Sequence, residues 1–278
     1  MDSLVSTEWL ASELGASDLR VVDATWVIAG QGDPVADYER AHIPGAVFLD
    51  LEDVRDTASP LPMMLPPAEK FAGRMQSLGL GDGSRIVVYD NSPYKTAARA
   101  WFMFKTFGAH DVAILDGGFA KWRAEGRAVD SGRETLCHRR LTARADRKQV
   151  RTLADMKANM DSGAEQVVDA RSTSRFTGEE PEPRAEIASG HIPGAHNVPI
   201  ARLFDADGTY KSPEAIAQVF ADAGVDVDRP IVTTCGSGVT ASVLAFALHR
   251  IGKDAALYDG SWSEWGADPT TPKETGPA

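Results

Sequence analysis

The sequence of 278 residues is poor in cysteine, in positive charge and in long apolar runs, and each shortage argues against a class of protein. Two cysteines, Cys137 and Cys235, are too few for the disulfide framework of a small secreted protein. A formal net charge of −11 argues against a surface for nucleic acid or an anionic membrane, because both need basic patches. No apolar run approaches the roughly 20 residues of a membrane helix. We therefore expect no nucleic-acid or membrane partner.

Signals for export and for metal binding are also missing. The first residues, MDSLVSTEWL, lack the basic and apolar regions of a secretory signal, so the cytoplasm is the expected location. The six histidines form no cluster with the cysteines, and the sequence predicts no metal site and no cofactor. A hydrophobic content of 43% and a charged content of 25% are typical of a globular protein.

What the sequence does contain is an internal duplication. The first half has VVDATW, AHIPGAVFL, RIVVYD and LDGGFAKW, and the second has VVDARS, GHIPGAHNV, PIVTTC and YDGSWSEW in the same order. We predict an N-terminal domain over residues 1–126, a polar linker over 127–149 and a C-terminal domain over 150–278. The first domain contains no cysteine and is expected to have a structural or interface role.

Short apolar runs alternate with amphipathic stretches in each half. The predicted strands are RVVD, AVFL, RIVVY and DVAIL in the first half, and VVD, AHNV, PIVTT and AALYD in the second. Helices that end at glycine are predicted for PPAEKFAGRMQSLG, TAARAWFMFKTFG, SPEAIAQVFADAG and TASVLAFALHRIG. STEWLASEL and RTLADMKANM predict threonine-capped helices. The alternation indicates an α/β fold, with a mainly parallel sheet covered by helices in each half.

The duplication provides an internal control, because features shared by both halves tend to serve the fold. The HIPGA motif occurs twice, so we interpret His42 and His191 as structural residues that make hydrogen bonds. Cys235 occurs in one half only: Asp90 stands at the equivalent position of the first half. The loop after Asp90 contains Pro93, which has no N–H group to donate. An active cysteine is therefore expected in the second half only.

The residues around Cys235 favour a nucleophile. Glycines follow the cysteine and tolerate the dihedral angles that turn successive N–H groups inward. The helix that comes next adds its dipole and the unsatisfied amides of its first turn. Both effects favour a thiolate, Ser237 can add a hydroxyl donor, and Thr240 can cap the helix or donate from its first turn. A buried, inert cysteine is the alternative interpretation.

Two arginines in the same half are candidates for binding an anionic substrate. Arg175 and Arg184 flank an acidic, proline-containing loop that is longer than its counterpart in the first half. Solvated surface positions are the alternative interpretation for both. A cysteine phosphatase would need a basic residue to close the loop, and Ala241 stands six residues after the cysteine. A dithiol redox cycle would need a second cysteine at CxxC spacing, which is absent.

The duplicated HIPGA halves, with CGSGVTA in the second half alone, resemble the tandem-domain rhodanese family over nearly the whole chain. The branch that the chain resembles most is that of the 3-mercaptopyruvate sulfurtransferases. The resemblance implies a five-stranded parallel sheet flanked by helices in each half. It also implies that Cys235 takes sulfur from 3-mercaptopyruvate as a persulfide and releases pyruvate. A thiol acceptor such as thioredoxin, or cyanide in an assay, then removes the sulfur.

Individual site residues follow from the same resemblance. The mercaptopyruvate branch has a C-G-S/T-G-V-T loop and an R-F-x-G-x-E-P-E-P-R segment, whereas the thiosulfate enzymes have basic residues after the cysteine. The implied catalytic residues are Cys235 and Ser237. The implied substrate-binding residues are Arg175, Arg184, Gly236, Gly238, Val239 and Thr240.

The chain departs from the family at one point. Some members use a histidine and an acidic residue of the N-terminal domain to assist the cysteine and the serine. Glu52 holds the acidic position, but Met63 stands where the histidine is expected, and a methionine cannot move a proton. The alternative functions are a thiosulfate sulfurtransferase, a non-catalytic persulfide carrier or binding module, and a structural scaffold.

Overall fold

The computed structural model describes residues 1–134 and 137–277, which form two compact units. The first unit consists of Met1–Thr57, the described part of Leu65–Asp146, and Asp205–Tyr210. The second consists of Ala58–Met64, Arg147–Phe204 and the described part of Lys211–Ala278. Whether residues 1–126, 127–149 and 150–278 delimit independently folding domains stays a prediction.

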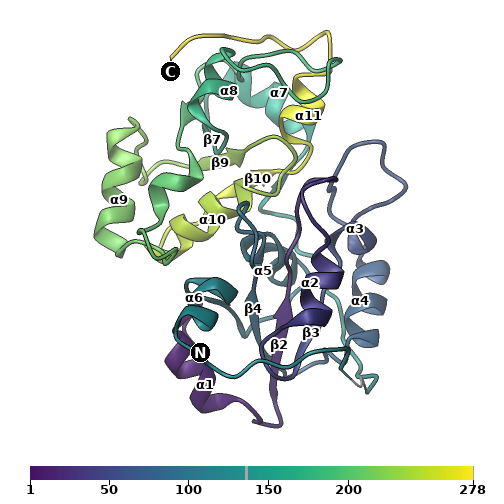
Figure 1. The fold of residues 1–278 in the computed structure, drawn as a ribbon. Helices are drawn as coiled ribbons and strands as arrows, with labels where there is room; N and C mark the ends of the chain where they lie inside the picture. The colour runs from purple at the N-terminus through teal and green to yellow at the C-terminus, as the bar shows by residue number, and fades with distance from the viewer. Residues whose placement is uncertain (135–136, 278) are drawn as a thin grey trace. The chain divides into compact units, whose positions relative to one another are not determined.

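Five parallel strands form the sheet of the first unit, in the order β1-β5-β4-β2-β3 (Figure 1). Their bounds are β1 Leu4–Val5, β2 Leu19–Asp23, β3 Ala46–Phe48, β4 Arg85–Tyr89 and β5 Val112–Leu115. The central strand β4, with the sequence RIVVY, is mainly β-branched and ends in tyrosine, which suits a sheet buried on both faces. The predicted α/β class with a five-stranded parallel sheet is confirmed here.

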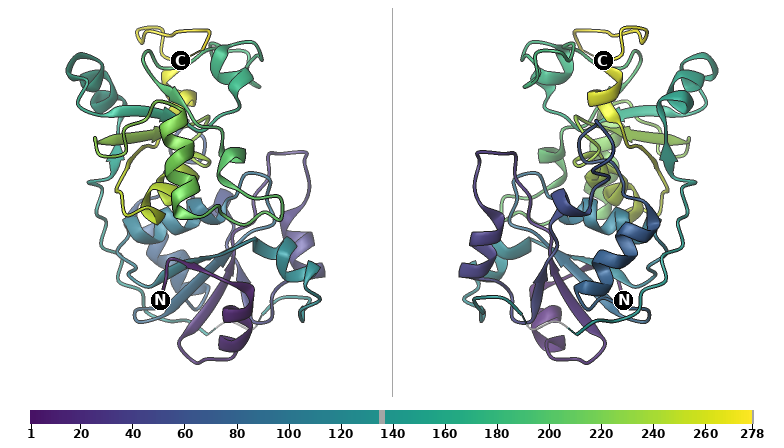
Figure 2. Two further views of the ribbon diagram at one scale, coloured as in Figure 1. Left: turned by 90° about the vertical axis from the view of Figure 1, so that its left-hand side faces the viewer. Right: turned by 90° about the vertical axis from the view of Figure 1, so that its right-hand side faces the viewer.

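Helices cover both faces of this sheet (Figure 2). Their bounds are α1 Thr7–Glu13, α2 Pro34–Arg40, α3 Leu51–Val54, α4 Ala68–Ser77, α5 Ala97–Thr106 and α6 Gly118–Ala124. Leu10 of α1 and Trp122 of α6 share one apolar cluster with Val21 and Val87 of the strands. On the opposite face, Phe71 of α4 stacks against Phe107 at the end of α5, with 4.4 Å between the ring centroids.

The second unit repeats this topology with strand order β6-β10-β9-β7-β8, again all parallel. Its strands are β6 Val150–Arg151, β7 Gln166–Asp169, β8 His196–Asn197, β9 Ile231–Thr234 and β10 Ala256–Tyr258. Its helices are α7 Leu153–Ser162, α8 Thr173–Thr177, α9 Pro213–Asp222, α10 Ala241–Arg250 and α11 Ser261–Trp265, with a 3₁₀ turn at Ile200–Leu203. The identical strand order confirms that the repeated motifs mark a repeated fold.

Some local predictions needed correction. Strands β1 and β6 have two residues each at the sheet edges, too short to produce an apolar pattern in the sequence. Helix α1 is capped by Ser6, whose hydroxyl accepts from the Trp9 amide, and not by threonine. Helix α7 has the expected cap, because the Thr152 hydroxyl accepts from the Asp155 amide.

The predicted linker contains no helix in the residues that the structure describes. This part of 127–149 runs along the first unit, where the Asp82 amide donates to the carbonyl of Arg140. Cys137 lies in this segment and is exposed. None of the helices that the described residues form has the length and apolar character needed to cross a membrane.

Candidate active site

Cys235 lies at the carboxyl end of the central strand of the second sheet. Strand β9 ends at Thr234, and residues 236–240 form the loop that leads into α10. Gly238 adopts φ +80°, a left-handed conformation that residues with a Cβ rarely tolerate, and this turns the loop back over the cysteine. The carboxyl edge of a parallel sheet is where α/β proteins bind their ligands.

The sulfur of Cys235 has a polar contact although the residue is buried. Its relative exposure is 2%, and the amide of Gly238 lies 3.1 Å from Sγ and donates to it. On the other side, the Ser261 hydroxyl accepts from the amide of Cys235, and the amide of Trp262 donates to its carbonyl. The sulfur is therefore not enclosed by hydrocarbon alone, as an inert cysteine would be.

Other amides of the loop are available to an anion. Within the described chain, the N–H groups of Gly236, Ser237, Val239 and Thr240 donate to no acceptor. One amide contacts the sulfur itself, fewer than the several that the sequence suggested. Amides in a glycine loop before a helix form a typical anion-binding concavity. The loop therefore supplies donors for a negatively charged group placed beside the sulfur.

The two hydroxyl residues of the loop differ from expectation. Ser237 is half-buried, and its hydroxyl makes no hydrogen bond to Cys235 or to any other described residue. Thr240 occupies the N-cap position of α10, but its side chain does not cap the helix. The cap, one of the two roles expected for Thr240, is therefore not formed, and the residue has helical rather than extended dihedral angles.

Arg175 reaches the cysteine loop from helix α8. Its guanidinium is held by Glu182, with 2.5 Å between Nη2 and Oε2, and its side chain is 25% exposed. A Cβ added to Gly236 would lie 3.2 Å from Nη2 of Arg175. Glycine at position 236 therefore lets the guanidinium approach the backbone next to Cys235.

Arg184 is linked to the same loop through Ser263 of α11. Nη2 of Arg184 donates to the Ser263 hydroxyl at 3.1 Å. That hydroxyl donates to the carbonyl of Gly236, which also accepts from the Ser263 amide at 2.8 Å. The structure thus brings both predicted arginines to Gly236, one residue from the nucleophile. Sequence reasoning missed Ser263, although Ala120 at the matching position of the first half distinguishes the repeats.

A buried ion-pair network supports Arg175. Arg171 is 3% exposed, and its guanidinium pairs with Asp169 and with Glu182, each at 2.7 Å. It also lies over the ring of Trp262, 4.6 Å from the centroid. Burial opposes the charge of this guanidinium, but attraction by Asp169 and Glu182 outweighs burial and raises the pKa of Arg171. Glu182 therefore divides its charge between two arginines.

The two predicted contributors from the N-terminal half take different places. Met63 is buried, has a left-handed φ of 56°, and belongs to the second unit through the segment Ala58–Met64. Glu52 belongs to the first unit, where its carboxylate accepts from the Trp26 indole and pairs with Arg55. A catalytic contribution of either residue stays a prediction.

The histidines of the two HIPGA motifs are structural. Nδ1 of His42 lies 2.9 Å from the carbonyl of Tyr38, and Nδ1 of His191 lies 2.8 Å from that of Phe176. Both rings are buried, and each stacks on the aromatic ring of the residue that it contacts. The same environment in both halves agrees with the interpretation drawn from the duplication.

Comparison with known proteins identifies the class. The model of the rhodanese-like domain matches residues 6–125 and 152–268. The chain therefore belongs to the rhodanese family and contains two such domains.

Individual relatives match nearly the whole chain. Human 3-mercaptopyruvate sulfurtransferase is 42% identical over 95% of this chain and 91% of its own length. A Cricetulus griseus protein named thiosulfate sulfurtransferase is 41% identical over the same shares. The crystal structure of an Escherichia coli 3-mercaptopyruvate sulfotransferase has a TM-score of 0.86 and 37% identity, and it covers 94% of this chain and 99% of its own.

Proposed function

We propose that this chain is a 3-mercaptopyruvate sulfurtransferase. The observation that carries the proposal is the loop at Cys235, where a nucleophilic sulfur, unpaired amides and two arginines meet. Mercaptopyruvate needs these groups, because it presents a sulfur for attack and a carboxylate and keto oxygen to be held.

The reaction begins with attack of the Cys235 thiolate on the sulfur of 3-mercaptopyruvate. A new S–S bond forms, the C–S bond breaks, and its electron pair stays on the carbon as the enolate of pyruvate. The proton of the attacked thiol moves to that carbon, which completes pyruvate and leaves a Cys235 persulfide anion. No external oxidant is needed, because the carbon that keeps the C–S electron pair is reduced while the transferred sulfur is oxidised to the sulfane level of the persulfide.

The remaining groups stabilise charge during this transfer. Arg175 and Arg184 are the cationic side chains at the loop, and they bind the carboxylate and the developing enolate oxygen. The amides of Gly236, Ser237, Val239 and Thr240 receive the negative outer sulfur of the persulfide. Because the Glu182 carboxylate is shared with Arg171, it neutralises only part of the positive charge of Arg175.

Thiosulfate is the competing donor, since the two names are borne by relatives of 42% and 41% identity. The loop favours mercaptopyruvate: Gly236 and Ser237 stand where basic residues follow the cysteine in the thiosulfate enzymes. The test is kcat/KM for both donors on the purified chain. A clear preference for thiosulfate would refute the choice of donor while leaving the cysteine mechanism in place.

The nucleophile has a matched control within the chain. Cys235→Ser should abolish sulfur transfer, whereas Cys137→Ser, at an exposed site in the linker, should leave it unchanged. Mass spectrometry after addition of mercaptopyruvate should show one added sulfur on the peptide that contains Cys235. Retained activity in Cys235→Ser would contradict the role of Cys235 as nucleophile and favour the structural scaffold. Formation of a persulfide without turnover would favour the carrier.

The acceptor is the second half of the proposal. A small thiol or the dithiol of a thioredoxin attacks the outer sulfur and regenerates the Cys235 thiolate, and cyanide does the same in an assay. We propose the cytoplasm as the location, where reducing conditions keep Cys235 free. The dependence of turnover on thioredoxin and its reductase tests the acceptor.

A further inference from the structure

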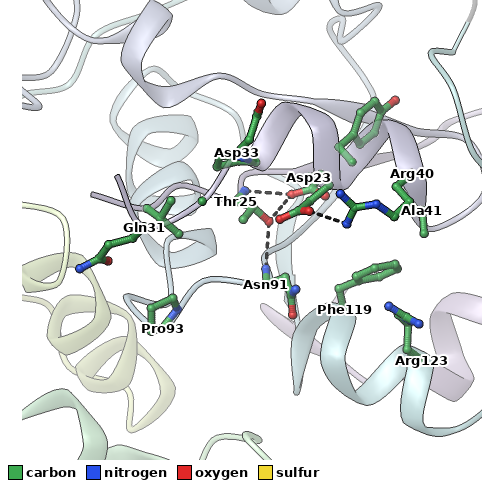
Figure 3. A pocket seen from close by; sticks show the side chains of 15 residues that line it. Asp23, Thr25, Gln31, Asp33, Arg40, Ala41, Asn91, Pro93, Phe119 and Arg123 are labelled. Carbon is green, nitrogen blue, oxygen red and sulfur yellow. Dashed lines mark hydrogen bonds and ion pairs between the residues drawn. The ribbon is translucent and has the colours of Figure 1, made fainter. Parts of the chain in front are cut away.

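The first unit contains a cavity of about 290 Å³, and none of the residues proposed for sulfur transfer lines it. It lies at the carboxyl edge of the sheet, where β2 and β4 end, and α2 and α6 supply further walls (Figure 3). Asp23 and Thr25 line it from the end of β2, Ala41 from the end of α2, and Phe119 from α6. The carboxyl edge of a parallel sheet is the usual position for ligand binding.

The second unit shows what occupies the equivalent space there. Asp169-Ala170-Arg171 matches Asp23-Ala24-Thr25 in the repeat. The turn is the same in both, because the amide of Arg171 donates to Asp169 at 2.9 Å and the amide of Thr25 donates to Asp23 at 2.9 Å. The side chains of positions 171 and 25 therefore start from equivalent backbone.

The guanidinium of Arg171 has four neighbours in the second unit, one of which is the Glu182 carboxylate at 2.7 Å. The guanidinium also donates to the Asp169 carboxylate and to the carbonyl of Gly190, each at 2.7 Å, and it lies over Trp262. This is a complete site for a guanidinium: an anion, a carbonyl acceptor and an aromatic face.

The first unit retains counterparts of three of these neighbours, Asp169, Gly190 and Trp262, but not the arginine. Asp23 corresponds to Asp169, Ala41 to Gly190 and Phe119 to Trp262, and each of these residues lines the cavity. Thr25 is too short to reach Ala41 or Phe119, and among the described residues its hydroxyl bonds only to Asp23 and to the amide of Asn91. The cavity is thus the space that a guanidinium fills in the other repeat.

The charge at this cavity is compatible with a cation. Asp23 is 4% exposed, and among the described residues no Lys or Arg side chain pairs with it. Burial raises its pKa to about 6, so the carboxylate is mainly ionised at neutral pH and lacks the partner that Asp169 has. Asp33 and Asp37 also line the cavity. Two arginines line it as well: Arg40 is paired with Asp37, and Arg123 is exposed with its guanidinium 6.0 Å from the centroid of the Phe119 ring.

We propose that this cavity of the first unit binds a small alkylguanidinium ion, with the guanidinium on Asp23, the carbonyl of Ala41 and the face of Phe119. A cavity of this size holds the guanidinium together with a short alkyl chain. The lining residues of this site belong to the first unit and the Cys235 loop belongs to the second, and occupation of the site requires no chemical step.

The test is calorimetric titration of the full chain with agmatine, which carries a guanidinium and a terminal ammonium, and with butylurea, an uncharged compound of similar length. Agmatine should bind saturably and butylurea should not. Thr25→Arg, which supplies the arginine of the other repeat, should abolish agmatine binding, and Thr25→Val, which leaves the space open, should retain it. Both variants should transfer sulfur at the rate of the parent, and this activity would confirm that they are folded.

Two results would overturn the proposal. One is the absence of saturable agmatine binding to the parent chain, and the other is binding by Thr25→Arg that equals the parent's. If Thr25→Arg fails to fold, Asp23→Asn decides the question, because removing the charge should weaken agmatine at least tenfold. Unchanged affinity in Asp23→Asn refutes the role of the carboxylate.

Discussion

The buried carboxyl of Asp23 should make the stability of the first unit depend on pH in an unusual direction. Its folded pKa is raised to about 6 by burial, against an ordinary value of 3.8. The folded state therefore binds the proton more tightly than the unfolded state. Its contribution to stability is greatest below pH 4, declines as the pH rises through the window from 4 to 6, and stays low above it.

The size of the effect follows from the separation of about two pKa units. Each unit corresponds to about 1.4 kcal/mol, so ionisation of Asp23 costs about 3 kcal/mol of unfolding free energy at neutral pH. Asn at position 23 cannot ionise, and its carbonyl can still accept from Thr25. Relative to the parent, Asp23→Asn should therefore gain about 3 kcal/mol between pH 3 and pH 8.

Hydrogen exchange measures this locally, on peptides that contain β2 and β4 of the first unit. Asp169→Asn in the second unit is the matched control, because Asp169 is paired with the buried Arg171. Breaking that pair should destabilise β7 and β9 by roughly 3–5 kcal/mol at neutral pH. A difference between Asp23→Asn and the parent that stays constant from pH 3 to pH 8 would refute the raised pKa.

Three further predictions concern the use of mercaptopyruvate, each measured by steady-state kinetics. Arg175→Ala should lower kcat/KM by about 2–3 kcal/mol, the value of a charge-assisted hydrogen bond, and unchanged kinetics would make Arg175 a surface residue. Ser263→Ala should release Arg184 and cost about 1–2 kcal/mol in kcat/KM. The double variant that carries Ser263→Ala and Arg184→Ala should be no worse than Arg184→Ala alone, because both changes remove the same contact. Gly236→Ala should raise KM severalfold, because the added Cβ displaces the Arg175 guanidinium. Gly73→Ala is the control and should behave as the parent, since its Cβ meets no atom within 4 Å. Equal effects of the two substitutions on KM would contradict the contact between Gly236 and Arg175.

Much of the fold could be predicted because the two halves of the sequence repeat the same motifs in the same order. The alternation of apolar and amphipathic runs is a local property of the chain, and it located the inner strands and the long helices. The alternation did not predict strands β1 and β6, which have two residues each. They are strands only because a neighbouring strand offers hydrogen-bond partners at the sheet edge, and no local pattern encodes that.

The candidate site divides in the same way. The repeat comparison singled out Cys235, which Asp90 replaces in the first half, and the two arginines, which lie in a loop that is shorter there. Sequence comparison did not find Glu182, whose carboxylate holds Arg175, nor Ser263, which is 79 residues from Arg184. Both act through hydrogen bonds between elements that only folding brings together.

The sequence by itself determined that two similar α/β domains are present and that one of them has a cysteine on a glycine loop. Tertiary structure alone decided which amides of that loop are unpaired, and that the first domain keeps a guanidinium environment without its arginine. The reason is physical: periodicity and turn chemistry depend on neighbours in the chain, whereas hydrogen-bond partners and cavities depend on groups that are distant in sequence and close in space.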